Sequence, residues 1–211
     1  MCSDIPKHMM SVGGDTVIRH TVRAFENAES IDSLAVVCSA EYSAEIKRQL
    51  SEFSKVKHIV YGGDNRMESA INGFRAVSEY ADMVAIHDGA RCLVTAEMID
   101  RVVGCAMEFG CATAGTAVTD TVKYTEDGKI LKTVLRENLY LAQTPQVFDK
   151  ELYMRAISSV DTSAQITDDN SLLEKIGVAV RCVDTGKTNI KLTTKDDLLY
   201  AEFLFSERGL K

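Results

Sequence analysis

The chain has 211 residues, of which 45% are hydrophobic and 26% charged, and its formal net charge is −7 at pH 7. This length fits one α/β domain with its own core, and the acidic balance argues against nucleic acid as the main partner, so an anionic substrate requires a local basic site. The sequence suggests neither a membrane span nor a signal peptide, and its six cysteines, with no C-x-x-C pair, favour a reduced cytoplasm.

The N-terminal stretch, residues 1–14, is expected to form a loop, because Pro6 restricts the residue before it and Gly13–Gly14 interrupts regular structure. Asp15 is then expected to cap a helix. The core face of this helix is indicated by residues at helical spacing, namely Val17, Ile18, Thr21, Val22 and Phe25.

Two apolar runs on either side of an amphipathic helix at 41–53 predict strands, a buried one at 33–38 and another at 56–61. The second strand runs into the glycine turn 62–69, which precedes another helix. A glycine turn before a helix offers free N–H groups and a positive dipole end, which suit phosphate, ribose or a base edge. The alternative is that Asp64 is only a helix cap and Arg66 an exposed charge.

The stretch 83–94 places an apolar strand directly before a polar turn, Asp88-Gly89-Ala90-Arg91. In open α/β sheets ligands bind just beyond the carboxyl ends of strands. Asp88 and Arg91 are therefore the first candidate functional residues. The alternative is an ordinary reverse turn with a solvated arginine.

Thr95 is expected to cap the next helix, and a strand rich in small residues follows at 111–118. The repeated order of strand and helix predicts a parallel doubly wound sheet. Two β-prone runs, 121–124 and 130–134, then flank Glu126-Asp127-Gly128-Lys129, which is typical of a hairpin. Because this hairpin has few neighbours to bury its faces, we expect an arm that packs on a second subunit of a homodimer.

The last third of the chain alternates helices with short apolar segments. Gln143-Thr144-Pro145-Gln146 is a polar interruption within the apolar run 139–148. The periodicity predicts helices at 149–157, 168–176 and 194–205 and a strand at 178–183, with the segment 188–191 between them.

The residues that could carry chemistry are mostly isolated cations in loops. The sequence contains no Ser-His-Asp ordering, no H-E-x-x-H and no P-loop G-K-[ST]. What remains is a set of cations with two carboxylates: Lys7, Arg66, Arg91, Arg136 and Lys191, with Asp88 and Asp168. Phosphoryl-type transfer needs such a set, since positioning and charge neutralisation supply most of its catalysis.

Several motifs occur in order along the chain: IPK at 5–7, GGDNRMES at 62–69, HDGARCLVT at 87–95, DTVK at 120–123, LRENLYLAQTPQVF at 135–148, TDDNSLLE at 167–174 and NIKLTT at 189–194. They resemble the methylerythritol phosphate cytidylyltransferase family of the non-mevalonate isoprenoid pathway. The resemblance implies a Rossmann-like nucleotidyltransferase fold over residues 1–211, with helices on both faces of the sheet and a dimerisation β-arm at about 120–140. It also implies CTP and 2-C-methyl-D-erythritol 4-phosphate as substrates, CDP-methylerythritol and pyrophosphate as products, Mg²⁺, and a homodimer.

The resemblance also assigns roles to single residues. The catalytic set would be Lys7, Asp88, Arg91 and Lys191, with Lys7 neutralising the α-phosphate under attack. The cytosine and ribose pocket would be lined by Gly63, Asp64, Ser69, Asp88 and Ala90, the last two with Arg91 on the ribose and metal side. The substrate phosphate would be held by Thr121 and Arg136 from the partner's arm, and by Thr167 and Lys191.

The sequence departs from the family pattern at three places. His8 replaces a Gln, and the central turn reads Gly89-Ala90-Arg91-Cys92 where the family has Ala-Ala-Arg-Pro, so that Cys92 loosens the turn. The family's first strand and glycine-rich loop, which ends in Arg-Met, precede what is here Met1. We therefore expect Met1 to be an internal residue of a longer protein and CTP to bind weakly to this chain. The missing strand would lie between the strands 33–38 and 83–88, so the chain is expected to fold poorly or to close those strands on each other.

Two alternatives remain open from the sequence. A ribitol phosphate cytidylyltransferase shares the fold and most motifs, although the HD-x-AR form of the central turn favours the isoprenoid enzyme. A non-catalytic nucleotide-binding homologue is the other, and the presence of Lys7, Arg136 and Lys191 together argues against it.

Overall fold

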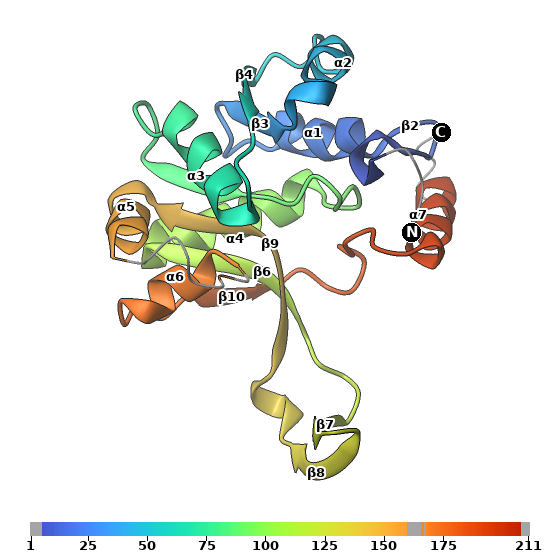
Figure 1. Cartoon of the computed structure of the whole chain (residues 1–211), viewed down its shortest axis with the longest axis vertical. Coiled ribbons are helices and arrows are strands. Elements are labelled where there is room, and N and C mark those ends of the chain that lie inside the picture. Colours follow the sequence, from blue (N-terminus) through green and yellow to red (C-terminus); the bar gives the residue numbers. More distant parts are fainter. Residues whose placement is uncertain (1–5, 160–165, 167, 208–211) are drawn as a thin grey trace.

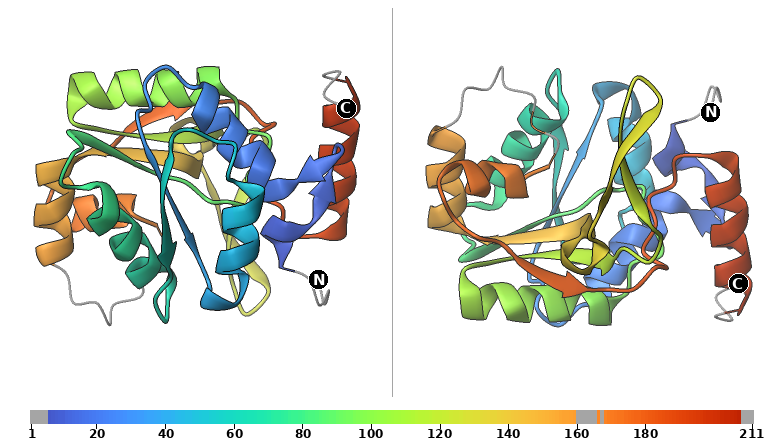
Figure 2. Two further views of the ribbon diagram at one scale, coloured as in Figure 1. Left: turned by 90° about the horizontal axis from the view of Figure 1, so that it is seen from above. Right: turned by 90° about the horizontal axis from the view of Figure 1, so that it is seen from below.

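A four-stranded sheet with helices on both faces forms the centre of the protein (Figure 1). The computed structural model describes residues 6–159, 166 and 168–207. The strand order is β10-β6-β9-β5, with β5 at Met83–Ile86, β6 at Cys111–Ala117, β9 at Tyr140–Asp149 and β10 at Arg181–Asp184. Helix α4 (Ala96–Phe109) covers one face, and the other is covered by α3 (Arg66–Val77), α5 (Lys150–Ser158) and α6 (Asn170–Lys175), as Figure 2 shows from above and below. The expected α/β fold is confirmed.

Each face of the main sheet has its own apolar core. On the α4 side, the buried residues of that helix recur at helical spacing, as the sequence predicted: Ile99, Val102, Val103 and Ala106. Thr95 caps the helix, since its side chain accepts a hydrogen bond from Met98 N. On the opposite face, the core gathers Met67, Ile71 and Phe74 of α3 with Phe148, Tyr153, Leu172 and Leu173.

The predicted parallel direction holds for β5, β6 and β10, but the sheet is mixed because of β9. β6 and β10 are parallel, but β9 runs antiparallel to both β5 and β6. The chain leaves β6, forms the arm and returns directly beside β6, and a direct return produces an antiparallel pair. The polar interruption at 143–146 lies within β9, where Gln143, Thr144 and Gln146 are buried. The strand predicted at 178–183 is observed at 181–184.

The N-terminal segment is more ordered than the expected loop. The 3-10 turn η1 (Lys7–Met9) precedes a hairpin of β1 (Ser11–Val12) and β2 (Asp15–Thr16). Gly13 and Gly14 have φ of 55° and 81°, so they turn this hairpin instead of ending a loop. Helix α1 (Val17–Asn27) begins after Thr16, so the expectation that Asp15 caps it is wrong, because the Asp15 carboxylate pairs with Arg19 and Arg23. Helix α7 (Lys195–Glu207) packs beside the hairpin (Figure 2).

The strands β3 (Leu34–Cys38) and β4 (Val56–Tyr61) pair in parallel in a separate sheet, with η2 (Ala40–Tyr42) and α2 (Ser43–Gln49) between them. The expectation that the strands 33–38 and 83–88 close on each other is wrong: within the described residues, β3 pairs with β4 and β5 with β9. Helix α3 contacts strands of both sheets. Packed helices therefore bridge the two sheets in place of direct strand pairing.

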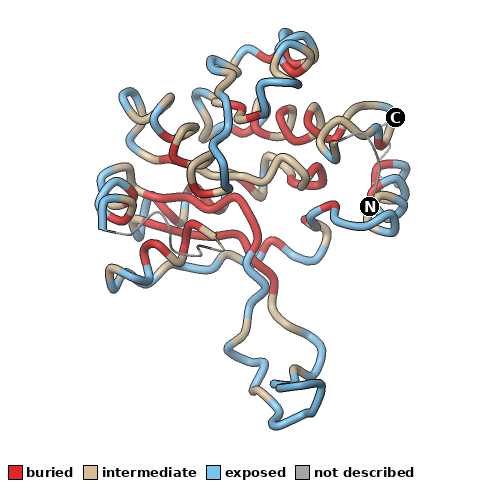
Figure 3. The backbone as a smooth tube through the Cα atoms, in the orientation of Figure 1, coloured by how far each residue is buried: buried red, intermediate tan, exposed pale blue. Residues whose placement is uncertain are grey.

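The predicted hairpin is confirmed and projects from the main sheet as an arm (Figure 1). It consists of β7 (Val122–Glu126) and β8 (Lys129–Val134), followed by the 3-10 turn η3 (Arg136–Asn138). Asp127 and Gly128 both have positive φ, as a two-residue hairpin turn requires. The arm is largely exposed (Figure 3), including Ile130, Leu131 and Leu135. No helix in the described part of the chain is long and apolar enough to span a membrane.

Candidate active site

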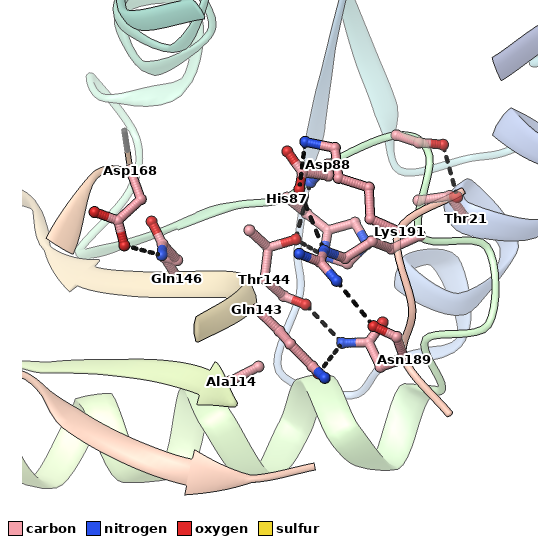
Figure 4. A network of polar contacts seen from close by, with 12 residues as sticks. Thr21, His87, Asp88, Ala114, Gln143, Thr144, Gln146, Asp168, Asn189 and Lys191 are labelled. Carbon is pink, nitrogen blue, oxygen red and sulfur yellow. Dashed lines mark hydrogen bonds and ion pairs between the residues drawn. The ribbon is translucent and has the colours of Figure 1, made fainter. Parts of the chain in front are cut away.

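Three charged residues from two chain segments meet just beyond the carboxyl end of β5. Asp88 Oδ2 lies 3.1 Å from Lys191 Nζ and 3.2 Å from Arg91 Nε (Figure 4). Arg91 Nη1 donates to the carbonyl of Asn189 at 2.9 Å, and the N–H of Leu192 donates to the carbonyl of Ala90 at 2.9 Å. The structure thus brings together Asp88, Ala90, Arg91 and Lys191, which the sequence placed about 100 residues apart.

Burial and charge pairing set the ionisation of this cluster, which we call the Asp88 cluster (Asp88, Arg91 and Lys191). Burial opposes ionisation of Asp88, but Lys191 and Arg91 outweigh it and lower the pKa of the carboxyl. Burial lowers the pKa of Arg91, while Asp88 acts in the opposite direction. With all three groups charged, the cluster carries one net positive charge. The side chain of Lys191 is 45% exposed, against 12% for Arg91, so the lysine is the cation a ligand meets first.

A buried polar frame holds both segments of the Asp88 cluster against β9. Thr144 Oγ1 accepts from the N–H of Asp88 at 3.0 Å and lies 3.0 Å from His87 Nδ1. Asn189 Nδ2 donates to the Thr144 carbonyl at 2.8 Å and to Gln143 Oε1 at 3.1 Å (Figure 4). Burial lowers the pKa of His87 to about 4, so this imidazole is neutral near pH 7. The turn and the Lys191 segment are therefore fixed by shared partners on one strand.

The glycine turn 62–69 forms a closed loop at the start of α3. Asn65 caps the helix by accepting from the N–H of Glu68 at 2.9 Å, so the alternative of Asp64 as the cap is wrong. Glu68 Oε2 accepts from the N–H of Asp64 at 2.8 Å, and Ser69 Oγ accepts from the N–H of Gly63 at 3.1 Å. A methyl group at Gly63 would clash with Glu68. The exposed carboxylate of Asp64 makes no hydrogen bond or ion pair among the described residues, so it is available to a ligand.

The alternative interpretation of Arg66 as an exposed charge is also wrong. Its Nη2 lies 2.7 Å from Asp169 Oδ2, and the Asp169 side chain is 1% exposed. Tyr153 donates its hydroxyl to Asp169 Oδ1 at 2.7 Å. On the adjacent residue, Asp168 Oδ2 accepts from Gln146 Nε2 at 3.0 Å (Figure 4). Asp168 thus lies against β9 and is not part of the Asp88 cluster.

The remaining predicted site residues lie elsewhere. The side chain of Lys7 is exposed on η1 and has no hydrogen bond or ion pair within the described part of the chain. Thr121 is exposed at the base of the arm, and Arg136 on η3 donates to the carbonyl of Thr119. Thr167 lies outside the described residues. One subunit therefore assembles the Asp88 cluster and the glycine loop, but not the arm residues beside them.

Sequence reasoning missed the buried frame and the Asp169 pair. Gln143 and Thr144 belong to the polar interruption in an apolar run, and that contrast was their only signal. Asn189 is fully buried, although nothing local marks it as such. Asp169 follows Asp168 in the sequence, and the two acids look equivalent until the structure separates their partners.

Comparison with known proteins shows that the chain is similar to cytidylyltransferases in sequence and in fold. Residues 1–207 match the family model "IspD: 2-C-methyl-D-erythritol 4-phosphate cytidylyltransferase". A protein of that name from Geobacter metallireducens is 37% identical over 215 residues, which cover 99% of this chain and 93% of the relative. A bifunctional IspD/IspF enzyme from Desulfotalea psychrophila is 36% identical over 206 residues, and the match spans 97% of this chain but only 53% of that relative. The crystal structure of 4-diphosphocytidyl-2C-methyl-D-erythritol synthase from Anaerococcus prevotii superimposes with a TM-score of 0.85 at 27% identity, over 93% of this chain and 88% of that one.

Proposed function

This chain belongs to the 2-C-methyl-D-erythritol 4-phosphate cytidylyltransferase family, and we propose how its residues transfer a cytidylyl group from CTP to 2-C-methyl-D-erythritol 4-phosphate. The observation that carries the proposal is the Asp88 cluster, a net positive group beyond the end of β5 with one accessible lysine. In the reaction, a phosphate oxygen of the sugar phosphate attacks the α-phosphorus of CTP. The bond from that phosphorus to the bridging oxygen breaks, and pyrophosphate leaves.

Neutralising the phosphate charges is the main task of the protein in such a reaction, because two anions must approach each other. We assign Lys191 to the substrate phosphate, since its ammonium is held 3.1 Å from Asp88 and remains open to a ligand. Arg91 pairs with Asp88 and ties the turn to the Asn189 carbonyl. The exposed Lys7 is assigned to the α-phosphate, which requires its side chain to move onto the bound nucleotide.

The nucleotide is assigned to the glycine loop and the adjoining turn. Gly63, Asp64 and Ser69 would contact the cytosine and ribose, and the Asp88–Ala90 turn would face the ribose. Three features support this assignment: the lack of room for any side chain at Gly63, an Asp64 carboxylate with no partner among the described residues, and the helix N-terminus behind them. Thr167, which lies outside the described residues, is assigned to the substrate phosphate by motif alone.

Mg²⁺ is the proposed cofactor, and Asp88 is the residue that would hold it. The described residues contain no cluster of three or more acidic, His or Cys ligands. Mg²⁺ is nevertheless commonly bound through one or two carboxylates together with substrate phosphates, and the lowered pKa of Asp88 keeps its carboxylate ionised. The ion would supply further neutralisation of the triphosphate.

We also propose a homodimer in which the arm of one subunit completes the site of the other. The arm and the adjoining start of β9 expose large apolar side chains that their own subunit does not cover, namely Tyr124, Ile130, Leu131, Leu135, Tyr140 and Leu141. Exposed apolar surface of this kind marks an interface. In this arrangement Thr121 and Arg136 act in trans on the substrate phosphate.

The proposal is tested by measuring pyrophosphate release and CDP-alcohol formation from CTP with 2-C-methyl-D-erythritol 4-phosphate, and with ribitol 5-phosphate as the competing substrate. Product from the first sugar phosphate alone is expected. Lys191→Ala should reduce kcat by about 10²-fold, the scale for losing one group that stabilises transition-state charge. Lys187→Ala is the matched control, because Lys187 lies on the same segment but donates to Thr119. Equal kcat for both variants would contradict the role of Lys191.

A further inference from the structure

The first residue of α3 connects two loops that are about 100 positions apart in the sequence. Arg66 directly follows the cap residue Asn65 and so belongs to the glycine loop. Its guanidinium reaches Asp169 Oδ2 at 2.7 Å, and Asp169 is buried. Asp169 and Asp168 lie directly before α6, and we call these two residues the Asp168 loop. The ion pair thus fixes the glycine loop to the Asp168 loop.

The contact continues from Asp169 into β9. The N–H of Asp169 donates to Gln146 Oε1 at 2.9 Å, and Gln146 Nε2 donates to Asp168 Oδ2 at 3.0 Å (Figure 4). Gln146 is therefore shared by both acids and holds the Asp168 loop against the strand. Two residues earlier on β9, Thr144 holds the Asp88 turn. Strand β9 consequently positions both the Asp88 cluster and the Asp168 loop. The Arg66–Asp169 ion pair connects the glycine loop to the same strand.

The chemistry of the pair suggests a role beyond stability. Asp169 is satisfied on both oxygens, by Arg66 and by the hydroxyl of Tyr153. The other terminal nitrogen of Arg66, Nη1, is buried without a hydrogen-bond partner among the described residues. A buried donor without a partner lowers stability, and folded proteins contain few such groups. The negative charges of Asp169 and, to a smaller extent, Asp88 raise the pKa of Arg66.

We propose that Arg66 is a positioning residue that couples the glycine loop to the Asp168 loop through Asp169, so that nucleotide binding sets the geometry in which the sugar phosphate is held. This inference rests on the proposed function, which assigns the glycine loop to CTP and Lys191, paired with the Asp88 that β9 holds through Thr144, to the sugar phosphate. Two ligands coupled in this way bind more tightly together than separately.

The test measures the affinity of 2-C-methyl-D-erythritol 4-phosphate by calorimetry, with and without a CTP analogue whose α,β-methylene group prevents transfer. The main variant is Arg66→Met combined with Asp169→Asn, which removes both charges and leaves no unpaired buried ion. Arg66→Lys keeps the charge but loses the planar fork of donors. Arg75→Met is the matched control, since Arg75 is exposed on the same helix and has no ion pair among the described residues.

In the wild type the analogue should tighten sugar phosphate binding by about 5- to 150-fold, the usual range of coupling between sites. The double variant should lose most of this factor, while its affinity for the sugar phosphate alone stays within about twofold of the wild type. Arg66→Lys should retain part of the factor, and Arg75→Met all of it. The KM for the sugar phosphate at saturating CTP should rise in the double variant by the lost factor, with kcat affected less.

Three results would overturn the inference. The first is a coupling factor of one in the wild type, and the second is an unchanged factor in the double variant. The third is an equal loss of sugar phosphate affinity with and without the CTP analogue, which indicates a merely structural role. Turnover by the wild-type protein, measured in parallel, distinguishes failure of this inference from failure of the proposed function. A wild-type protein that forms CDP-methylerythritol yet shows no coupling refutes only the role of Arg66.

Discussion

Replacing Asp88 with Asn should destabilise the protein in a way that depends on pH. The substitution removes the carboxylate that pairs with Arg91 and Lys191 but preserves the size of the side chain. A hydrogen bond to a charged group contributes about 1.5–3 kcal/mol, whereas a pair with a half-exposed lysine contributes about 1 kcal/mol or less. Because the Asn side chain keeps some hydrogen bonding, we expect a loss of about 2 kcal/mol in unfolding free energy at pH 7.

The pH dependence follows from the direction of the pKa shift. The folded state lowers the pKa of Asp88 below its ordinary value of 3.8, so the contribution of the ionised carboxylate is complete above that value. It is lost as the pH falls through the lower, folded-state pKa. The difference between wild type and Asp88→Asn should therefore be constant from neutral pH to about pH 5 and should shrink steadily in stronger acid.

Urea unfolding of both proteins, followed by circular dichroism from pH 7 to pH 3, measures this difference. For a domain of this size, a loss of about 2 kcal/mol also lowers the midpoint of thermal unfolding by about 4–8 °C. Glu45→Gln is the control, because Glu45 pairs with Arg48 on the exposed surface of α2 and its loss should leave the unfolding free energy almost unchanged. Equal losses for the two variants, or a difference that persists unchanged at pH 3, would refute the argument.

Three further predictions concern the dimer, a buried histidine and the glycine loop. Mixing Arg136→Ala with Lys7→Ala protein should restore part of the activity that each has lost, because some mixed dimers contain one intact site; no recovery on mixing, measured by pyrophosphate release, would contradict action in trans. His87 has its pKa lowered from 6.5 to about 4, so the unfolded chain takes up a proton there before the folded chain does, and stability should fall by up to about 3 kcal/mol as the pH decreases from 6.5 to 4. His87→Gln should flatten that part of the stability profile, and an unchanged profile would show that another group is responsible. Gly63→Ala should raise the KM for CTP by about tenfold, since relieving the clash with Glu68 costs roughly 1–3 kcal/mol, while the KM for the sugar phosphate changes little; an unchanged KM for CTP would remove the loop from the nucleotide site.

Local patterns in the sequence determined most elements and several candidate residues. The Asp127–Gly128 turn was predictable because positive φ at both positions is a local requirement that few residues meet. Thr95 was predictable as a cap because the hydroxyl bonds a backbone N–H only three residues away. Asp88 and Arg91 were found because a polar turn directly after an apolar strand is visible within a dozen residues. The motif order indicated the family for the same reason, since each motif is short and continuous.

Only the tertiary structure decided how these pieces meet. The direction of β9 depends on where the arm returns the chain, and no residue within the strand specifies it. Lys191 and Asp88 form an ion pair although about 100 residues separate them, and Arg66 pairs with Asp169 over a separation of 103 residues. Two adjacent acids, Asp168 and Asp169, have different partners because one faces Gln146 and the other the Arg66 guanidinium. Partners this distant are chosen by packing over the whole fold, because a hydrogen bond acts over about 3 Å in space and leaves no periodic trace in the sequence.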